Sequence, residues 1–113
     1  MQLFNRQDTI VALSTPAGTG ALGVIRISGS HTRQLVQALC KKAAIAALPS
    51  HAARLVRVYD GERVVDEAVL TFFDGPRSFT CENTAELSLH GSPYILEQVM
   101  RLCLQHGARL VHA

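Results

Sequence analysis

One segment of the chain places a strand and a helix in succession, and each has a single apolar face. Apolar and polar residues alternate strictly over Ala85–His90, which is the period of a strand with one face on a core. Gly91 breaks this strand, and Ser92 and Pro93 are typical of a helix N-cap and first helical residue. The apolar stripe of the following helix comprises Ile95, Leu96, Val99, Leu102 and Cys103, and Gly107 ends the helix. Two such elements in succession indicate a sheet with helices packed on one side.

The first part of the chain predicts two strands and another amphipathic helix. β-prone residues at Thr9–Thr15 and Gly23–Ser28 flank a glycine-rich stretch, which predicts a hairpin or a bulged loop. Ser30 is a suitable N-cap for a helix after it. The apolar stripe of that helix would be Leu35, Val36, Leu39 and Cys40. The stretch Ala43–Ser50 ends near a proline and reads as a connection.

A hairpin is predicted next, because Asp60-Gly61 lies between the β-rich runs Ala53–Tyr59 and Arg63–Phe73. Residues Ala68–Phe73 are apolar at nearly every position, which predicts a central strand covered on both faces. Ala108–Ala113 begins a further strand. The expected fold is α+β: a mixed β-sheet with two helices packed on one face, in a single domain spanning residues 1–113.

Composition argues against several classes of function. A formal net charge of +2 with scattered basic residues gives no basic patch for nucleic acid. The five histidines show no metal-ligand spacing, and the sequence has no GxxxxGK[ST] phosphate loop. No signal peptide and no apolar run of roughly 20 residues occurs, so a cytoplasmic protein is expected. The three cysteines predict no disulfide, with Cys40 and Cys103 buried on the helix stripes and Cys81 in a loop.

The stretch Gly18–Gly23 (GTGALG) matches GxGxxG, with glycines at Gly18, Gly20 and Gly23. A dinucleotide site needs a helix directly after the glycines, but a β-prone run follows here, which excludes that site. Two interpretations remain open for this stretch. It is either a bulged hairpin turn or a loop whose backbone approaches a ligand closely.

Two charged residues interrupt predicted strands. Arg26 lies between apolar neighbours, and Glu86 shares one strand face with Ser88 and His90. Both could simply face solvent, but Arg26 could also clamp an anion or carbonyl, and Glu86 could accept two N–H donors of an amino-pyrimidine ring. His90, at a strand end, is either a ligand contact or a structural residue of the turn. A nucleophilic pair of Cys81 with His90 is disfavoured, because no oxyanion hole accompanies it.

Three segments together resemble one family. They are Ser14–Gly29 (STPAGTGALGVIRISG), Phe73–Thr80 (FDGPRSFT), and the third block, which has Glu82, Glu86, Leu87 and His90-Gly91-Ser92-Pro93. The family is that of the tRNA uridine-5-carboxymethylaminomethyl modification GTPases, MnmE (also called TrmE). The resemblance runs from Asp8 to the end of the chain. It departs at Cys81 and Asn83, where the family usually has glycine and aspartate.

The resemblance implies an N-terminal domain similar to the folate-binding aminomethyltransferases. Such a domain forms a homodimer and binds a tetrahydrofolate derivative, 5-formyl- or 5,10-methylene-tetrahydrofolate, which supplies a one-carbon unit. The family's folate-contacting arginine and glutamate match Arg26 and Glu86. The glycines Gly18, Gly20 and Gly23 would lie nearby, and His90 is a further candidate contact. No catalytic and no metal-binding residue is expected in this chain.

The family's other parts are expected outside this chain. They are a helical domain and a Ras-like GTPase that binds GTP, Mg²⁺ and K⁺. With the flavin- and NADH-dependent partner MnmG (also called GidA), the complete protein would modify the wobble uridine of tRNA. The alternative is a small-ligand-sensing dimerisation module without one-carbon chemistry, which would not need Arg26 and Glu86 to converge.

Overall fold

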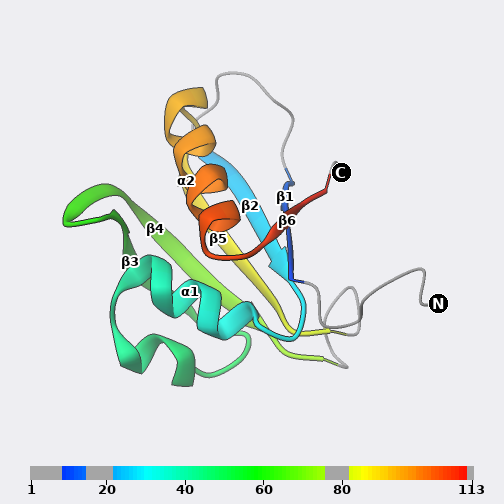
Figure 1. The fold of residues 1–113 in the computed structure, drawn as a ribbon. Helices are drawn as coiled ribbons and strands as arrows, with labels where there is room; N and C mark the ends of the chain where they lie inside the picture. The colour runs from blue at the N-terminus through cyan, green and yellow to red at the C-terminus, as the bar shows by residue number, and fades with distance from the viewer. Residues whose placement is uncertain (1–8, 15–21, 76–81, 112–113) are drawn as a thin grey trace.

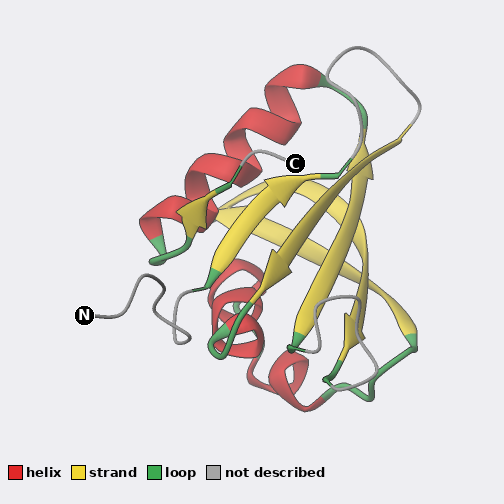
Figure 2. Ribbon diagram, turned by 90° about the vertical axis from the view of Figure 1, so that its right-hand side faces the viewer, coloured by secondary structure: helices red, strands yellow, loops and turns green. Residues whose placement is uncertain are grey.

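The computed structural model describes residues 9–14, 22–75 and 82–111. These residues form a six-stranded mixed sheet with the strand order β3-β4-β5-β2-β1-β6. Its strands are β1 Ile10–Leu13, β2 Leu22–Ser28, β3 Ala53–Asp60, β4 Arg63–Phe73, β5 Thr84–His90 and β6 Arg109–Leu110. The helices are α1 Thr32–Cys40 and α2 Pro93–Gln105, with a short 3₁₀ helix, η1, at Ala43–Ala47. Both α-helices pack on the same side of the sheet (Figures 1 and 2), which confirms the predicted α+β class.

Strands β2 and β5 form the centre of the sheet. They pair antiparallel, as do β1 with β2, β4 with β5, and β3 with β4. The β1–β2 pair confirms the predicted hairpin, although its glycine-rich connection, with Gly18 and Gly20, lies outside the described residues. Among the strands that the structure describes, only β6 runs parallel to its neighbour, β1. The sheet is therefore antiparallel except at one edge.

Alternation along the strands decides which face is buried. Along β2, β4 and β5 every second residue is buried, and both α-helices lie on that side of the sheet, so the other face carries no helix of the described residues. The core combines strand residues (Val11, Ile25, Ile27, Val56, Val58, Ala68, Leu70, Phe72, Ala85, Leu87 and Leu89) with helix residues (Leu35, Val36, Leu39, Leu96, Val99 and Leu102). The two helix stripes predicted from the sequence are thus confirmed, except that Ile95 is only half-buried. The helix-free side is called the open face below.

The predicted cap at Ser30 is wrong. Helix α1 begins at Thr32, and His31 takes the N-cap position without a side-chain cap. The hydroxyl of Ser30 lies 3.1 Å from the ring of His31, while Thr32 donates to the carbonyls of Gly29 and Asn83. The entry to α1 is therefore held by a tertiary contact with residue 83. By contrast, Ser92 caps α2 as predicted, its hydroxyl accepting from the N–H of Ile95.

Two other expectations need correction. Strand β4 is interior, between β3 and β5, but it is not covered on both faces: Val69, on the open face, is 43% exposed. Its apolar run belongs to a sheet that is covered on one face, because no helix in the part of the chain that the structure describes packs on the other. The expected connection after α1 contains the helix η1. The predicted hairpin is confirmed, with Asp60 paired to Arg63 and Gly61 at a positive φ in the turn.

Gly23 allows α2 to approach β2 closely. A Cβ atom at this position would lie 2.7 Å from both Cδ atoms of Leu96, which is nearly fully buried. We expect Gly23→Ala to lower the free energy of unfolding by roughly 1–3 kcal/mol, because the extra methyl group overpacks this contact. In a Leu96→Ala background, which opens the space, the same change should cost much less. Urea unfolding of wild type, the two single variants and the double variant measures both effects. An equal loss of unfolding free energy on Gly23→Ala in the two backgrounds would contradict this packing role.

Cys40 and Cys103 are buried free thiols, as predicted. Burial raises the pKa of both thiols to about 12, and for Cys103 the neighbouring Cys40 adds to the increase. The folded state keeps both thiols protonated up to about pH 12, whereas the unfolded state begins to lose these protons near pH 9. The free energy of unfolding is therefore unaffected by these thiols below about pH 9 and falls as the pH rises from 9 toward 12. Cys81 lies outside the described residues, and its place in a loop stays a prediction.

Native protein at pH 8 should therefore protect two of its three thiols from a disulfide-exchange reagent. We expect Cys81 to react first, and Cys40 and Cys103 to react only when the protein unfolds, since they are buried and protonated. Peptide mapping after brief labelling identifies the modified thiol, and urea-unfolded protein gives the reference rate. Rapid labelling of Cys103 in folded protein would contradict its burial on the core face of α2.

Candidate functional site

Arg26 and Glu86 meet on the open face at the centre of the sheet. They occupy directly paired positions of β2 and β5, and both alternate with core residues, so both side chains emerge on the open face. Arg26 Nη2 donates to Glu86 Oε2 at 3.1 Å. The side chains are 35% and 22% exposed, so the pair is partly screened from water but still accessible. These two charged residues stand out in the sequence, and the structure brings them together.

The ion pair presents a donor and an acceptor side by side on a nearly neutral patch. A carboxylate can accept more hydrogen bonds than the one that Arg26 donates to Glu86, and a guanidinium carries five N–H donors in all. A polar ring with adjacent N–H groups and a carbonyl matches this arrangement. A simple anion fits less well, because Glu86 offsets the charge of Arg26. The geometry therefore favours a polar heterocycle over a phosphate or other small anion.

The residues beside the pair are small. Ala12 is the cross-strand partner of Arg26 on one side, and Thr71 is the partner of Glu86 on the other. One row along the sheet, Val24 and Val69 flank Ser88. None of these neighbouring positions carries a long side chain. A flat ring could thus lie against the sheet here with its polar edge on the pair.

His90 contacts a different acid. Its ring Nδ1 lies 2.7 Å from Asp66 Oδ1, and its backbone N–H donates to Asp66 Oδ2 at 2.9 Å. The ring is largely exposed, whereas the side chain of Asp66 is only 8% exposed. This contact supports the structural interpretation of His90 as a residue that holds the strand end. Asp66 was not predicted from the sequence, although an acid at a core position of β4, in step with Ala68 and Leu70, is a signal for a buried partner.

The glycines divide between two regions. Gly18 and Gly20 lie outside the described residues, so their place near the ion pair stays a prediction. Gly23 belongs to β2 and faces Leu96 of α2, on the opposite side of the sheet from Arg26. Asn83, where the resembled family usually has an acid, accepts from the N–H of Gly75 through its side chain. An amide at this position therefore serves the loop after β4.

Three other features were considered in the described part of the chain: a metal site, a membrane-spanning helix and a cavity. Residues 9–14, 22–75 and 82–111 contain no cluster of histidine, cysteine or acidic side chains suited to a metal ion. None of the helices there is both long and apolar enough to span a bilayer. A cavity of about 380 Å³ lies between α1 and the end of α2, lined in part by His31, Gln34 and His106. It lies on the helix side, away from the ion pair.

The chain is similar to known proteins over nearly its whole length. The family model described as "GTP-binding protein TrmE N-terminus" matches residues 9–113. The chain is similar to the tRNA modification GTPase MnmE of Cytophaga hutchinsonii, 44% identical over 105 residues that make up 93% of this chain and 23% of the relative. Its similarity to the protein of the same name from Francisella philomiragia is 36% identity over 95% of this chain and 23% of the relative. The corresponding Lactococcus lactis protein is 34% identical over 97% of this chain and 24% of its own length. The chain thus spans about a quarter of the length of these relatives.

Proposed function

The chain belongs to the family of TrmE N-termini, and we propose that it binds a tetrahydrofolate derivative on its open face and pairs with a second copy of itself there. The observation that carries this proposal is the convergence of Arg26 and Glu86 at the centre of that face. Glu86 would accept the amino and ring N–H donors of a pterin. Arg26 would donate to a carbonyl or carboxylate of the same ligand. The small neighbours Ala12 and Thr71 leave room for a flat ring.

The wider role concerns a longer protein. Curated relatives are named tRNA modification GTPases, and we propose that this domain serves such a protein in the cytoplasm. There the bound folate would supply the one-carbon unit for the 5-carboxymethylaminomethyl group of wobble uridine. GTP, Mg²⁺ and K⁺ would bind to parts of the longer protein outside this chain, and MnmG would act as the partner. The residues of this chain would hold and orient the folate.

Calorimetric titration of the chain with 5-formyltetrahydrofolate and with tetrahydrofolate tests the folate site directly. We expect saturable binding of at least one of the two, with one ligand per chain. Absence of binding by both at millimolar ligand would contradict the proposal. A ligand-sensing module without one-carbon chemistry remains the alternative. Binding of an unrelated small molecule at the ion pair, with no binding of either folate, would favour that alternative.

A dimer through the open face should be visible in solution. Val69 is 43% exposed on this face and Leu22 is 64% exposed on the same side of β2, so a second copy would bury both. Light scattering after size exclusion should give twice the chain mass of 12.3 kDa at micromolar concentration. Val69→Asp should shift the protein toward the monomer. Leu104→Asp is the matched control, because Leu104 is equally exposed (43%) but lies on α2. A wild-type chain that stays monomeric at high concentration would contradict the dimer.

A further inference from the structure

Phe73 places an aromatic ring on the open face, beside the Arg26–Glu86 pair. It lies two residues after Thr71 in β4, so both side chains emerge on the same face of the sheet. Thr71 is the cross-strand partner of Glu86, which makes Phe73 the diagonal neighbour of that carboxylate. Side chains in a diagonal pair are close enough for an aromatic ring to reach across. Phe73 is thus positioned to contact a ligand that binds to Glu86.

His51 holds the ring of Phe73 in one orientation. The two rings meet edge-on, with their centroids 5.1 Å apart and their planes at 89°. This T-shaped arrangement is favourable for two aromatic rings. Phe73 is half-buried, whereas His51 is exposed and adds nothing to the core. The contact therefore orients an aromatic side chain on the open face.

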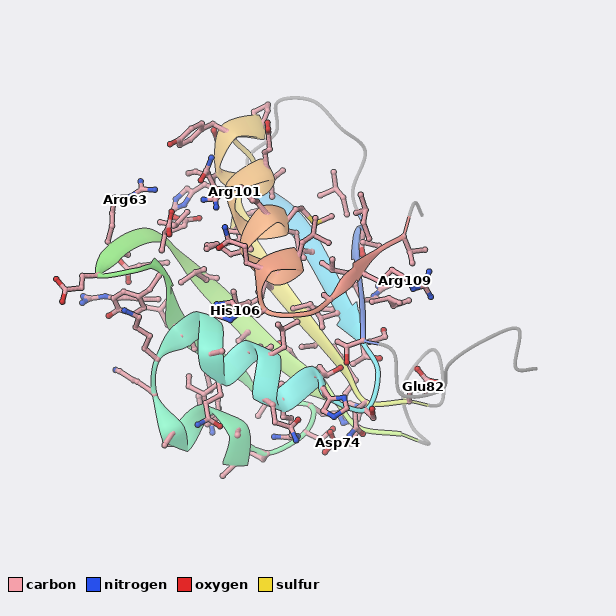
Figure 3. The ribbon with its side chains drawn as sticks, in the orientation of Figure 1. Arg63, Asp74, Glu82, Arg101, His106 and Arg109 are labelled. Carbon is pink, nitrogen blue, oxygen red and sulfur yellow. The ribbon has the colours of Figure 1, made fainter. Side chains whose placement is uncertain are left out.

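The backbone of His51 is unusual for a residue with a side chain. Its φ of 62° lies in the left-handed region, and Lys41 is the other described non-glycine residue with a positive φ. The N–H of His51 donates to the carbonyl of Phe72 at 2.7 Å. The hydroxyl of Ser50 lies 2.7 Å from Nδ1 of His51 and accepts from the N–H of Asp74 at 3.0 Å. Figure 3 shows Asp74 at this end of the sheet.

Strain of this kind persists only where surrounding contacts hold it, and it is frequent where a protein grips a ligand. Here the held turn brings the ring of His51 against Phe73. The next row of the sheet is already filled: Thr84, the cross-strand partner of Phe73, is fully buried, and its hydroxyl lies 3.3 Å from that of Ser28. A flat ring beside Phe73 must therefore lie on the side of Glu86.

We propose that Phe73 is a specificity-determining contact for the ligand of the ion pair, and that His51 is the residue that positions it. This inference rests on the proposed folate site. When Glu86 accepts the amino and ring N–H groups of a pterin, the pyrimidine part of the pterin lies beside Phe73 and packs against its ring. The hydrogen bonds of Glu86 recognise the polar edge of the ligand, and Phe73 recognises that the ligand is a flat ring.

Substitution of Phe73 tests the contact by calorimetric titration with 5-formyltetrahydrofolate and with tetrahydrofolate. Phe73→Leu should weaken the folate that binds wild-type protein by about two- to tenfold, the range of a single aromatic contact. Phe73→Tyr keeps the ring and should bind nearly as well as wild type. Tyr94→Leu is the matched control, because Tyr94 is an exposed aromatic residue on α2, and it should leave affinity unchanged. Equal losses in Phe73→Leu and Tyr94→Leu would overturn the proposal.

His51→Gly tests the positioning role without disturbing the turn, because glycine adopts a positive φ without strain. The variant should unfold at the same urea concentration as wild type or a higher one, yet bind folate more weakly. In a Phe73→Leu background the same change should weaken binding no further, since His51 acts through Phe73. A loss of stability with unchanged affinity would show that His51 is only structural. Additive losses of affinity in the double variant would also contradict the positioning role.

The outcomes separate this inference from the proposed function. If wild-type protein binds neither folate, the folate site and the inference both fail. If folate binding depends on Glu86 but is equally tight in wild type and in folded Phe73→Leu, only the inference fails. Weaker binding in Phe73→Leu, restored in Phe73→Tyr, supports both.

Discussion

Replacing Glu86 with glutamine should lower the affinity for a bound tetrahydrofolate by about ten- to a hundredfold. The lost charge-assisted hydrogen bonds to a partly buried ligand are worth roughly 1.5–3 kcal/mol. Glutamine keeps the size of the side chain, but one of its two terminal atoms is a donor and would face a ligand N–H group. Glu86→Gln should therefore cost nearly as much as Glu86→Ala. Calorimetric titration with the folate that binds wild-type protein measures the loss.

Ser88→Ala is the control for this experiment, because Ser88 lies two residues along β5 on the same open face. It should change affinity by less than either Glu86 variant. Glu86→Gln also removes the negative charge that pairs with Arg26, so thermal unfolding must show that the variant remains folded at the titration temperature. Unchanged folate affinity in both Glu86 variants, with the fold intact, would rule out the ion pair as the folate site.

Removing the Arg33 side chain should cause a large loss of stability. Its guanidinium donates to both carboxylate oxygens of Asp74, at 3.3 and 2.9 Å, and to the carbonyls of Ala46 and Leu48 at 2.9 and 2.7 Å. It also stacks 4.1 Å from the ring of Phe72. One side chain thus joins α1, η1 and the end of β4, and it is only 20% exposed. Figure 3 shows Asp74 beside the first turn of α1.

Arg33→Met keeps the length of the apolar stem but leaves the two carbonyls and the carboxylate without their donor. We expect the free energy of unfolding to fall by about 1.5–3 kcal/mol, the range for hydrogen bonds to a charged group, because two carbonyls lose their donor while the 39% exposed Asp74 stays in contact with water. Arg63→Met is the control. Arg63 pairs with Asp60 but is 56% exposed, so its loss should cost at most about 1 kcal/mol. Urea unfolding compares the two, and similar losses in both variants would contradict the role assigned to Arg33.

The sequence predicted the elements of this fold better than the contacts between them. Strict alternation over residues 85–90 and the Ser92-Pro93 signal predicted β5 and α2, because both depend on residues close in the chain. The cap at Ser30 was wrong because Thr32 bonds to residue 83, a contact that local spacing cannot reveal. For the same reason, nothing in the sequence predicted that Arg33 reaches Asp74.

The site was predicted in part. Arg26 and Glu86 stood out because charged residues interrupt apolar strands, and the family resemblance named the same two positions. Their direct pairing depends on the order of strands in the sheet, which periodicity does not determine. His90 was grouped with Glu86 by alternation alone. The structure instead gives it Asp66 as its partner, because β4 and β5 are neighbours in the sheet.

The separation of Arg26 and Glu86 along the chain has a consequence for how the protein is made. The two partners are 60 residues apart along the chain, and helix α1 and the β3–β4 hairpin occupy the interval between them. A hairpin with a two-residue turn closes quickly, whereas pairing over such a distance must first overcome the entropy of closing a long loop. During synthesis, β2 leaves the ribosome well before β5 and must wait for it with its central edge unpaired. We therefore expect the ion pair to form only after β5 has been made, since a nascent chain that stops before residue 86 holds Arg26 without Glu86.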